Sequence, residues 1–257
     1  MKFAKSLLLV GLLQLALAAP VLAQSALDQV KQAGVLRIGT EGTYAPFTYH
    51  DKSGALVGFD VEIAEQVAKH IGVKPQFVEG QWDGLIAGVD AKRYDVVVNE
   101  VGITPARQAK YDFSEPYIAS KAALIVRADD DSIKSFADLK GKKSAQTITS
   151  NFGQLAEKSG ATLVPTEGFD QSIALVLQHR ADATINDSLS FLDFKKHQPD
   201  APVKIAATQA NADFSGILLA KDKPQLLAAI NEALEATKKD GTYAKISQKY
   251  FGADVSH

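Results

Sequence analysis

The stretches WDGLIAGVDAKRYDVVVNE (residues 82–100) and FDQSIALVLQHRADATIND (residues 169–187) align without a gap, 87 positions apart. Each has the pattern of an amphipathic helix, a loop and a short apolar strand. Any helix-to-strand unit shares the apolar positions and a basic last helical turn. It does not share the polar pairs Asn99–Glu100 and Asn186–Asp187 at matching strand ends. The repeat therefore predicts that one βα design is used twice.

The rest of the chain continues the alternation of short β-branched runs with amphipathic stretches. Strands are expected at 35–40, 76–80, 94–99, 122–128, 144–148, 161–165, 182–186 and 203–208. Helices are expected at 60–71, 82–92, 150–160, 170–180, 188–197, 223–241 and 242–252. This order predicts an α/β fold with largely parallel sheets. Ligands of open α/β sheets lie at the C-terminal ends of strands, so two similar lobes predict a cleft between them.

The segment NEVGITPARQAKYDFS (99–114) follows the first repeated strand and has the features of an anion site. Thr104 fits an N-cap, Pro105 the first position of a short helix over 105–110, and Arg107 adds a guanidinium suited to a carboxylate or phosphate. Gly102 leaves the backbone open to close approach. Arg107 equally fits a surface ion pair with an acid such as Asp112.

A second helix start with the same character lies at Ser150 or Asn151 in TITSNFGQLAEK. Asp187 supplies the opposite charge at a strand end, although it fits equally well as the N-cap of the helix that begins at Ser188. A carboxylate site beside a carboxylate matches the two charged ends of an α-amino acid. Tyr44 and Trp82 are candidate aromatic walls, or plain core residues.

The N-terminal 23 residues have two lysines, an apolar run and small residues at Val21 and Ala23. This layout predicts a signal peptide cleaved after Ala23 and export to the periplasm. The chain has no cysteine, which excludes disulfides, thiol nucleophiles and a lipid-attached cysteine. Without the leader, 26 basic and 30 acidic residues remain, so no basic footprint for nucleic acid is present.

The chain resembles the polar amino-acid class of extracellular solute-binding proteins of ABC importers, solute-binding protein family 3. Long ordered matches carry the resemblance, among them LRIGTEGTYAPFTYHDKSGALVGFDVEIAEQVAKHIG, WDGLIAGVDAKRYDVVVNEVGITPARQAKYDFSEPY and LLAAINEALEATKKDGTYAKISQKYFGADVS. The segments KGKKSAQTITSNFGQLAEKSGA and ADATINDSLSFLDF are most similar to L-cystine-binding members. The resemblance implies two α/β lobes that close on a ligand and are joined by two hinge strands.

The hinge strands implied by the resemblance cross near 118–121 and 212–215. The expected domains are a signal peptide (1–23), lobe 1 in two parts (24–119 and 214–257) and an inserted lobe 2 (120–213). The implied partners are an amino acid, with L-cystine favoured, and an inner-membrane ABC permease. The implied form is a monomer, with no cofactor, metal or catalytic residue.

The resemblance also implies a role for each site residue. Arg107 would bind the ligand carboxylate with the amides of Gly102 and of Ser150 or Asn151, and Asp187 would bind the α-ammonium, helped by the Gly102 carbonyl. The remaining ligand contacts would be Tyr44, Trp82, Glu41 and Asn99, with Thr104 starting the anion-binding helix.

Glu100 departs from the pattern, because cystine-binding members are expected to have glutamine beside Asn99. If it faces the ligand, it would hold the far ammonium of cystine or favour a cationic amino acid; if it faces solvent, it has no bearing on selectivity. Two alternatives remain open. One is a binding protein for another polar or cationic amino acid, and the other is a periplasmic dehydratase-like enzyme with Glu100 or Glu41 as its acid or base.

Overall fold

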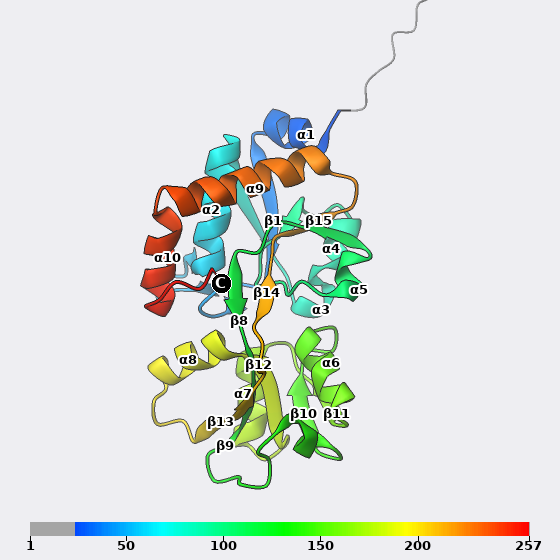
Figure 1. The fold of residues 1–257 in the computed structure, drawn as a ribbon, viewed down its shortest axis with the longest axis vertical. Coiled ribbons are helices and arrows are strands. Elements are labelled where there is room, and N and C mark those ends of the chain that lie inside the picture. Colours follow the sequence, from blue (N-terminus) through cyan, green and yellow to red (C-terminus); the bar gives the residue numbers. More distant parts are fainter. Residues whose placement is uncertain (1–23, 257) are drawn as a thin grey trace, which may run out of the picture.

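The computed structural model describes residues 24–256, which form two lobes joined by extended strands (Figure 1). The predicted signal peptide and its cleavage site lie outside the described residues. In lobe 1 the sheet order is β5-β1-β6-β15-β7, and in lobe 2 it is β11-β10-β12-β9-β13. The chain passes from lobe 1 to lobe 2 through β8 (Ile118–Ser120) and returns through β14 (Asp213–Ser215), which pair antiparallel.

Lobe 1 contains a five-stranded sheet together with the helices from both ends of the described chain (Figure 1). Its strands are β1 (Val35–Thr40), β5 (Lys74–Glu79), β6 (Val96–Val97), β7 (Tyr111–Phe113) and β15 (Leu218–Ala220), with a small sheet of β2 (Thr43–Tyr44), β3 (Thr48–His50) and β4 (Leu56–Val57). Its helices are α1 (Ala26–Ala33), α2 (Phe59–Ile71), α3 (Trp82–Leu85), α4 (Ala87–Asp90), α5 (Pro105–Gln108), α9 (Pro224–Lys239) and α10 (Thr242–Phe251).

Helix α2 illustrates how the sequence builds this lobe. Phe59, Ile63 and Val67 recur every four residues and are fully buried, so one stripe of the helix faces the core. The helix ends at Gly72, whose φ of 85° suits glycine in a left-handed cap. Helices α9 and α10 pack beside α2, and Phe59 and Phe251 have ring centroids 5.0 Å apart.

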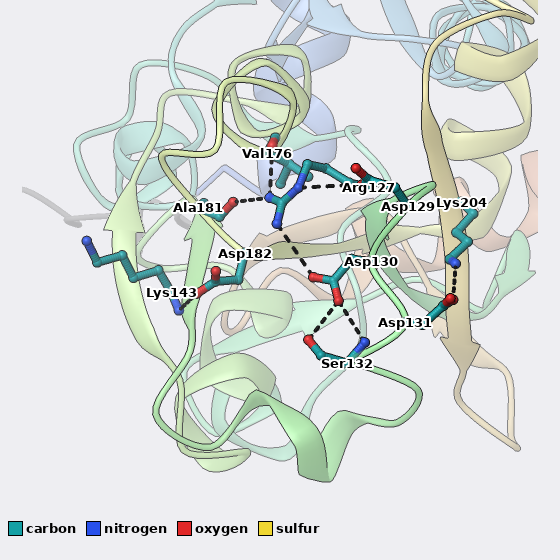
Figure 2. Close-up of polar contacts among 10 residues, drawn as sticks. All are labelled: Arg127, Asp129, Asp130, Asp131, Ser132, Lys143, Val176, Ala181, Asp182 and Lys204. Carbon is teal, nitrogen blue, oxygen red and sulfur yellow. Dashed lines mark hydrogen bonds and ion pairs between the residues drawn. The ribbon is translucent and has the colours of Figure 1, made fainter.

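Lobe 2 has the strands β9 (Ala122–Arg127), β10 (Lys143–Gln146), β11 (Thr162–Pro165), β12 (Ala183–Asp187) and β13 (Val203–Thr208). Its helices are η1 (Phe136–Leu139), α6 (Asn151–Lys158), α7 (Phe169–Leu177) and α8 (Ser188–His197). At the end far from lobe 1, Arg127 Nη1 donates to the carbonyl oxygens of Val176 (3.2 Å) and Ala181 (3.1 Å), which anchors the C-terminal end of α7 (Figure 2).

The two repeated segments, 87 positions apart, have the same local structure in both lobes. Asp95 accepts a hydrogen bond from the backbone N–H of Arg37 (2.9 Å), and its repeat partner Asp182 accepts one from Lys143 (2.7 Å). Each pair joins the loop before a repeated strand to the neighbouring strand. The repeat therefore describes a common βα unit.

The helix predicted over 82–92 is split into α3 and α4. The hydroxyl group of Tyr94 donates to the carbonyl of Leu85, which an unbroken α-helix would offer to Val89. The Val89 N–H donates instead to Ile86 (3.1 Å), so the helix tightens to a 3₁₀ turn. Gly88 permits this, because a Cβ there would lie 2.1 Å from the Tyr94 hydroxyl oxygen.

The expectation of largely parallel sheets holds for four of the five strands in each five-stranded sheet. The fifth strand, β15 in lobe 1 and β9 in lobe 2, runs antiparallel to both of its neighbours. The cause is the connection between lobes: β9 follows β8 and starts at the cleft, where Ala122 pairs with Asp187 at the end of β12. It must run away from the cleft while the βα strands run toward it, and β15 does the same in lobe 1 after β14.

Candidate functional site

A cavity lies between the lobes, at the C-terminal ends of the repeated strands. Lobe 1 contributes Glu41, Tyr44, Trp82, Asn99 and Glu100 to its lining, and lobe 2 contributes Thr147, Ser150, Asn151, Phe152, Gly168, Phe169 and Asn186. The lining thus combines carboxylates, amides and aromatic rings from both lobes.

Arg107 lies beside this cavity on α5. Thr104 caps that helix by accepting from the Arg107 N–H (3.3 Å), with Pro105 in the first turn as predicted, although the helix ends at Gln108 rather than 110. The guanidinium carbon is 5.2 Å from the centre of the Trp82 ring, and Nη1 donates to the Gly102 carbonyl (2.9 Å). Nη2 is buried without a hydrogen-bond partner. Burial lowers the pKa of Arg107 to about 10, opposed by the charge of Glu100.

The start of α6 presents backbone amides on the opposite lobe. Ser150 is the N-cap, and its hydroxyl oxygen accepts from the Gly153 N–H (2.9 Å). The same hydroxyl donates to the carbonyl of Thr147 (2.9 Å), which closes the loop before the helix. A Cβ on Gly102 would lie 3.5 Å from the side-chain nitrogen of Asn151. The α6 start and the Arg107 helix therefore meet across the cleft.

Asp187 is buried at the end of β12 and caps α8. One carboxylate oxygen accepts from the Leu189 N–H (2.8 Å), and the other accepts from the hydroxyl of Ser120 on the hinge strand β8. Burial raises the pKa of Asp187 to about 6, against the lowering effect of these hydrogen bonds. Its two predicted roles, cap and cation partner, are not exclusive, because a carboxylate has lone pairs for more than two donors.

Glu100 faces inward, with a side chain only 8% exposed, so the alternative that it turns to solvent is wrong. Its backbone has a φ of 49°, and its N–H donates to Asp60 at the start of α2. One carboxylate oxygen accepts from Ser215 on the hinge strand β14 (2.9 Å). Burial, followed by the nearby charge of Asp187, raises the pKa of Glu100 well above its ordinary range.

Glu41 and Asn99 form one hydrogen-bonded unit in the lobe 1 wall. The Asn99 side-chain amide donates to Glu41 (2.6 Å) and accepts from the Glu41 N–H (2.7 Å). Burial raises the pKa of Glu41 to about 7, despite the hydrogen bond from Asn99. The lobe 1 wall of the cavity therefore carries two buried acidic groups, Glu41 and Glu100.

Aromatic rings line the cavity from both lobes. Trp82 is 8% exposed, and its indole N–H has no hydrogen-bond partner. Its repeat partner Phe169 lies in the lobe 2 wall. Tyr44 donates across the cleft to the side-chain oxygen of Asn186 (2.9 Å). Tyr44 and Trp82, which the sequence left open as wall or core, are buried residues that also line the cavity.

Direct hydrogen bonds between the lobes flank the cavity. On one side are the Tyr44 bond to Asn186 and a bond from the Ser190 hydroxyl to the carbonyl of Ala45 (3.0 Å). On another, Asp83 accepts from the backbone and hydroxyl of Thr149 (2.9 and 2.8 Å). The lobes are therefore in direct contact around the cavity.

Seven of the predicted site residues line the cavity: Glu41, Tyr44, Trp82, Asn99, Glu100, Ser150 and Asn151. Four others, Gly102, Thr104, Arg107 and Asp187, are not among the lining residues, and they contact one another or the hinge. Five further lining residues were not predicted from the sequence: Thr147, Phe152, Gly168, Phe169 and Asn186. The repeat could have found two of these, since Phe169 matches Trp82 and Asn186 matches Asn99.

In residues 24–256 no group of three or more His, Asp or Glu side chains is arranged to hold a metal ion. Within the same range no helix is long and apolar enough to cross a membrane.

Two α/β lobes, two linking strands and a polar cavity between the lobes define a bilobal solute-binding protein. Residues 36–253 match the family described as bacterial extracellular solute-binding proteins, family 3, and the chain belongs to this family. The L-cystine-binding protein TcyA of Bacillus subtilis is 46% identical over 88% of this chain and 85% of its own. TcyJ of Escherichia coli, also an L-cystine-binding protein, is 38% identical over 96% of both chains.

Solved structures with this fold show how the lobes are placed. An ancestral arginine-binding protein bound to arginine has a TM-score of 0.81, with 39% identity over 85% of this chain and 99% of its own. The L-cystine solute receptor of Neisseria gonorrhoeae, in its unliganded open conformation, is 47% identical over 90% of this chain and 99% of its own. Its TM-score is nevertheless only 0.60. The lobe arrangement is therefore nearer to the ligand-bound one, in agreement with the hydrogen bonds between the lobes.

Proposed function

We propose that this chain is the substrate-binding component of an amino-acid ABC importer, and that it binds L-cystine in preference to other amino acids. The observation that carries the amino-acid assignment is the pairing of opposite charges beside one cavity. Arg107 has a buried N–H without a partner, and Asp187 and Glu100 are buried carboxyl groups at the same cleft. A zwitterion supplies the missing partner of each.

In this proposal the ligand carboxylate is bound by Arg107 and by the amides at the α6 start, with Gly102 close to both. The α-ammonium is bound by Asp187, and Glu100 faces the second ammonium of cystine. Tyr44, Trp82 and Phe169 enclose the ligand body, and Glu41 with Asn99 contacts its far end. Thr104 acts indirectly, because it fixes the helix that holds Arg107.

Two lines of support favour cystine among amino acids. Relatives named for L-cystine share 38% to 46% of their residues with this chain over most of its length. Cystine also has two ammonium groups, and the cavity has more than one buried carboxyl group, Glu41 and Glu100, for the second of them. Arginine or lysine would satisfy the same excess of acids, so a cationic amino acid is the alternative ligand.

Binding acts by closure of the lobes. Contacts that a ligand makes to both lobes at once exist only in the closed state, so the ligand shifts the open–closed equilibrium by its differential affinity. A shift from 1:99 to 99:1 requires about 5.5 kcal/mol, which is the scale of two charge-assisted clamps. A membrane permease would then recognise the closed shape. The leader predicts that this takes place in the periplasm, and the family resemblance implies that the chain acts as a monomer.

The enzyme alternative rests on one neighbour. An ancestral amino-acid-binding protein described as a precursor of cyclohexadienyl dehydratase has a TM-score of 0.80 and 35% identity over 88% of this chain and 99% of its own. Glu41 and Glu100 have raised pKa values because they are buried, a property that a general acid needs. The proposal takes them as ligand contacts, and turnover of a cyclic acid would contradict it.

Titration calorimetry on protein stripped of ligand by unfolding and refolding tests the proposal. L-cystine, arginine, lysine, the other standard amino acids and a few cyclic acids are the probes. We expect saturable binding that is tightest for cystine. Binding of arginine or lysine alone would be consistent with the importer role but would contradict the assignment of cystine as the ligand. No binding of any amino acid would contradict both the role and the ligand.

Arg107→Ala tests the site. We expect it to weaken binding about 100-fold or more, because it leaves the ligand carboxylate unpaired in a buried place. The fold should survive, since the side chain donates only to the Gly102 carbonyl. Arg93→Ala is the matched control, an exposed arginine that stacks on Tyr94 outside the cavity. Unchanged affinity in Arg107→Ala would remove this residue from the site.

A further inference from the structure

Asp83 connects the two lobes without lining the cavity. It lies in the first turn of α3 in lobe 1, while its hydrogen-bond donors lie in lobe 2, in the loop between β10 and α6. One carboxylate oxygen accepts from the N–H (2.9 Å) and the hydroxyl (2.8 Å) of Thr149, and the other accepts from the Ile148 N–H (3.3 Å). A single carboxylate thus receives three hydrogen bonds from the opposite lobe.

The loop that Asp83 binds has both its ends at the cavity. Thr147 and Ser150 line the cavity, and the Ser150 hydroxyl donates to the Thr147 carbonyl (2.9 Å). Ser150 is also the N-cap of α6, whose amides stand opposite Arg107. Asp83 binds the middle of this loop, so it holds the α6 start in place from across the cleft.

The repeat supplies an internal comparison. Asp170 is the partner of Asp83 and occupies the first turn of α7 in lobe 2. An acid at that place is explained by the helix dipole alone. Within residues 24–256, however, Asp170 accepts no hydrogen bond from lobe 1, whereas Asp83 accepts three from lobe 2. The bond between lobes is therefore not a consequence of the repeated design.

We propose that Asp83 is a positioning residue for ligand binding: by bridging the lobes it fixes the α6 start against the ligand only in the closed state. This rests on the proposed function for the nature of the ligand, a molecule with a carboxylate at the α6 start. Because the three bonds exist only between closed lobes, they add to the free-energy difference between closed and open forms. They form after the first encounter, so they slow dissociation more than they speed association.

The test compares Asp83→Asn, Thr149→Val and the double variant with the wild type, using L-cystine in calorimetry and stopped-flow kinetics. Asp83→Asn should weaken binding about fivefold, mostly through faster dissociation, since bonds to an exposed carboxylate are worth less than buried ones. Thr149→Val removes the hydroxyl bond but keeps the charge of Asp83, and should weaken binding about twofold. In the Asp83→Asn background its further effect should be smaller than twofold, because the hydroxyl then donates to a neutral amide oxygen rather than to a carboxylate.

Two controls separate this role from others. Asp170→Asn removes an equal charge from the equivalent position of lobe 2, and should leave cystine affinity within about twofold of the wild type. The melting temperature of ligand-free protein should be the same for Asp83→Asn and Asp170→Asn, because a purely structural defect would lower it. Small-angle scattering at equal, subsaturating cystine should show a larger open fraction for Asp83→Asn alone.

The outcomes separate the two proposals. Equal cystine affinities of Asp83→Asn and Asp170→Asn, or additive effects in the double variant, would overturn the positioning role of Asp83. The proposed function would still stand in that case, provided that the wild-type protein binds cystine. If only arginine or another amino acid binds, the same variants are measured with that ligand, and only the cystine preference fails. If no amino acid binds the wild-type chain, both proposals fail.

Discussion

At the scale of single residues, the site is an arrangement of buried charges held by the hinge. Glu100 is bonded to Ser215 on β14, and Asp187 to Ser120 on β8. Each carboxylate therefore touches one of the two strands that link the lobes. A cation between these carboxylates would act where the lobes rotate, which couples charge neutralisation to closure.

The charge of Glu100 yields a prediction about selectivity. Glu100→Gln should weaken arginine and lysine about 10- to 100-fold, because a buried cation would lose a charged partner. Cystine should lose less, because its second carboxylate offsets the charge of its second ammonium. Calorimetry with both ligands measures the difference, and Glu79→Gln, an exposed glutamate paired with His50, is the control. Equal losses for all ligands, or none, would show that Glu100 does not select for charge.

The predictability of single residues follows from how local their cause is. Thr104, Ser150 and Asp187 were predictable as helix starts, because a cap depends on the next three residues. Asp83 was not predictable as a link between lobes, because its partner Thr149 is 66 residues away and meets it only after the lobes close. The role of Glu100 needed its backbone direction, set by Asp60 in a distant helix.

At the scale of elements, the sequence predicts long helices and strands well and short ones poorly. Strand β1 was expected at its observed bounds, since six residues carry a clear apolar pattern. Strands β2, β4 and β15 have two or three residues, too few for any periodicity, and they form because neighbouring strands pair with them. The domain boundaries at 119/120 and 213/214 fall within β8 and β14, and they stay predictions.

The start of α6 provides a test at this scale. Ser150→Ala removes the cap that accepts from the Gly153 N–H, and should lower the free energy of unfolding by about 1 kcal/mol. It should also weaken ligand binding, because the first turn of α6 frays beside the proposed carboxylate. Urea unfolding and calorimetry measure the two effects.

The matched control for this change is Ser135→Ala. Ser135 caps η1 in the same lobe through a capping box and does not line the cavity. The Ser135→Ala protein should lose stability but keep the ligand affinity of the wild type. A Ser150→Ala protein with reduced stability and wild-type affinity would exclude the α6 start from the carboxylate site.

At the scale of the whole molecule, the closed form holds several buried carboxyl groups at once. Burial raises the pKa of Glu41 and Asp60 to about 7 and of Asp187 to about 6, and it raises that of Glu100 as well. Their ordinary values are 4.5 for Glu and 3.8 for Asp. The ligand-free closed form therefore binds more protons than the unfolded chain between about pH 4 and 7, and its free energy of unfolding falls as pH rises through this window.

A bound ammonium reverses this dependence. A cation beside Asp187 and Glu100 lowers their pKa values, so the complex holds fewer protons than the ligand-free closed form and binding releases protons. Affinity should therefore rise as pH rises from 5 to 7, and the increase in melting temperature caused by cystine should be larger at pH 7.5 than at pH 5.5. Ligand-free protein should show the opposite trend in its melting temperature.

Calorimetry at pH 6 in buffers of different ionisation enthalpy measures the released protons directly. We expect net release for the wild type and a smaller release for Glu100→Gln, because one of the titrating groups is gone. The exposed Glu79→Gln variant should release as many protons as the wild type. Uptake of protons, or equal release by all three proteins, would contradict a ligand ammonium among these carboxylates and would place the positive end of the ligand elsewhere in the cleft.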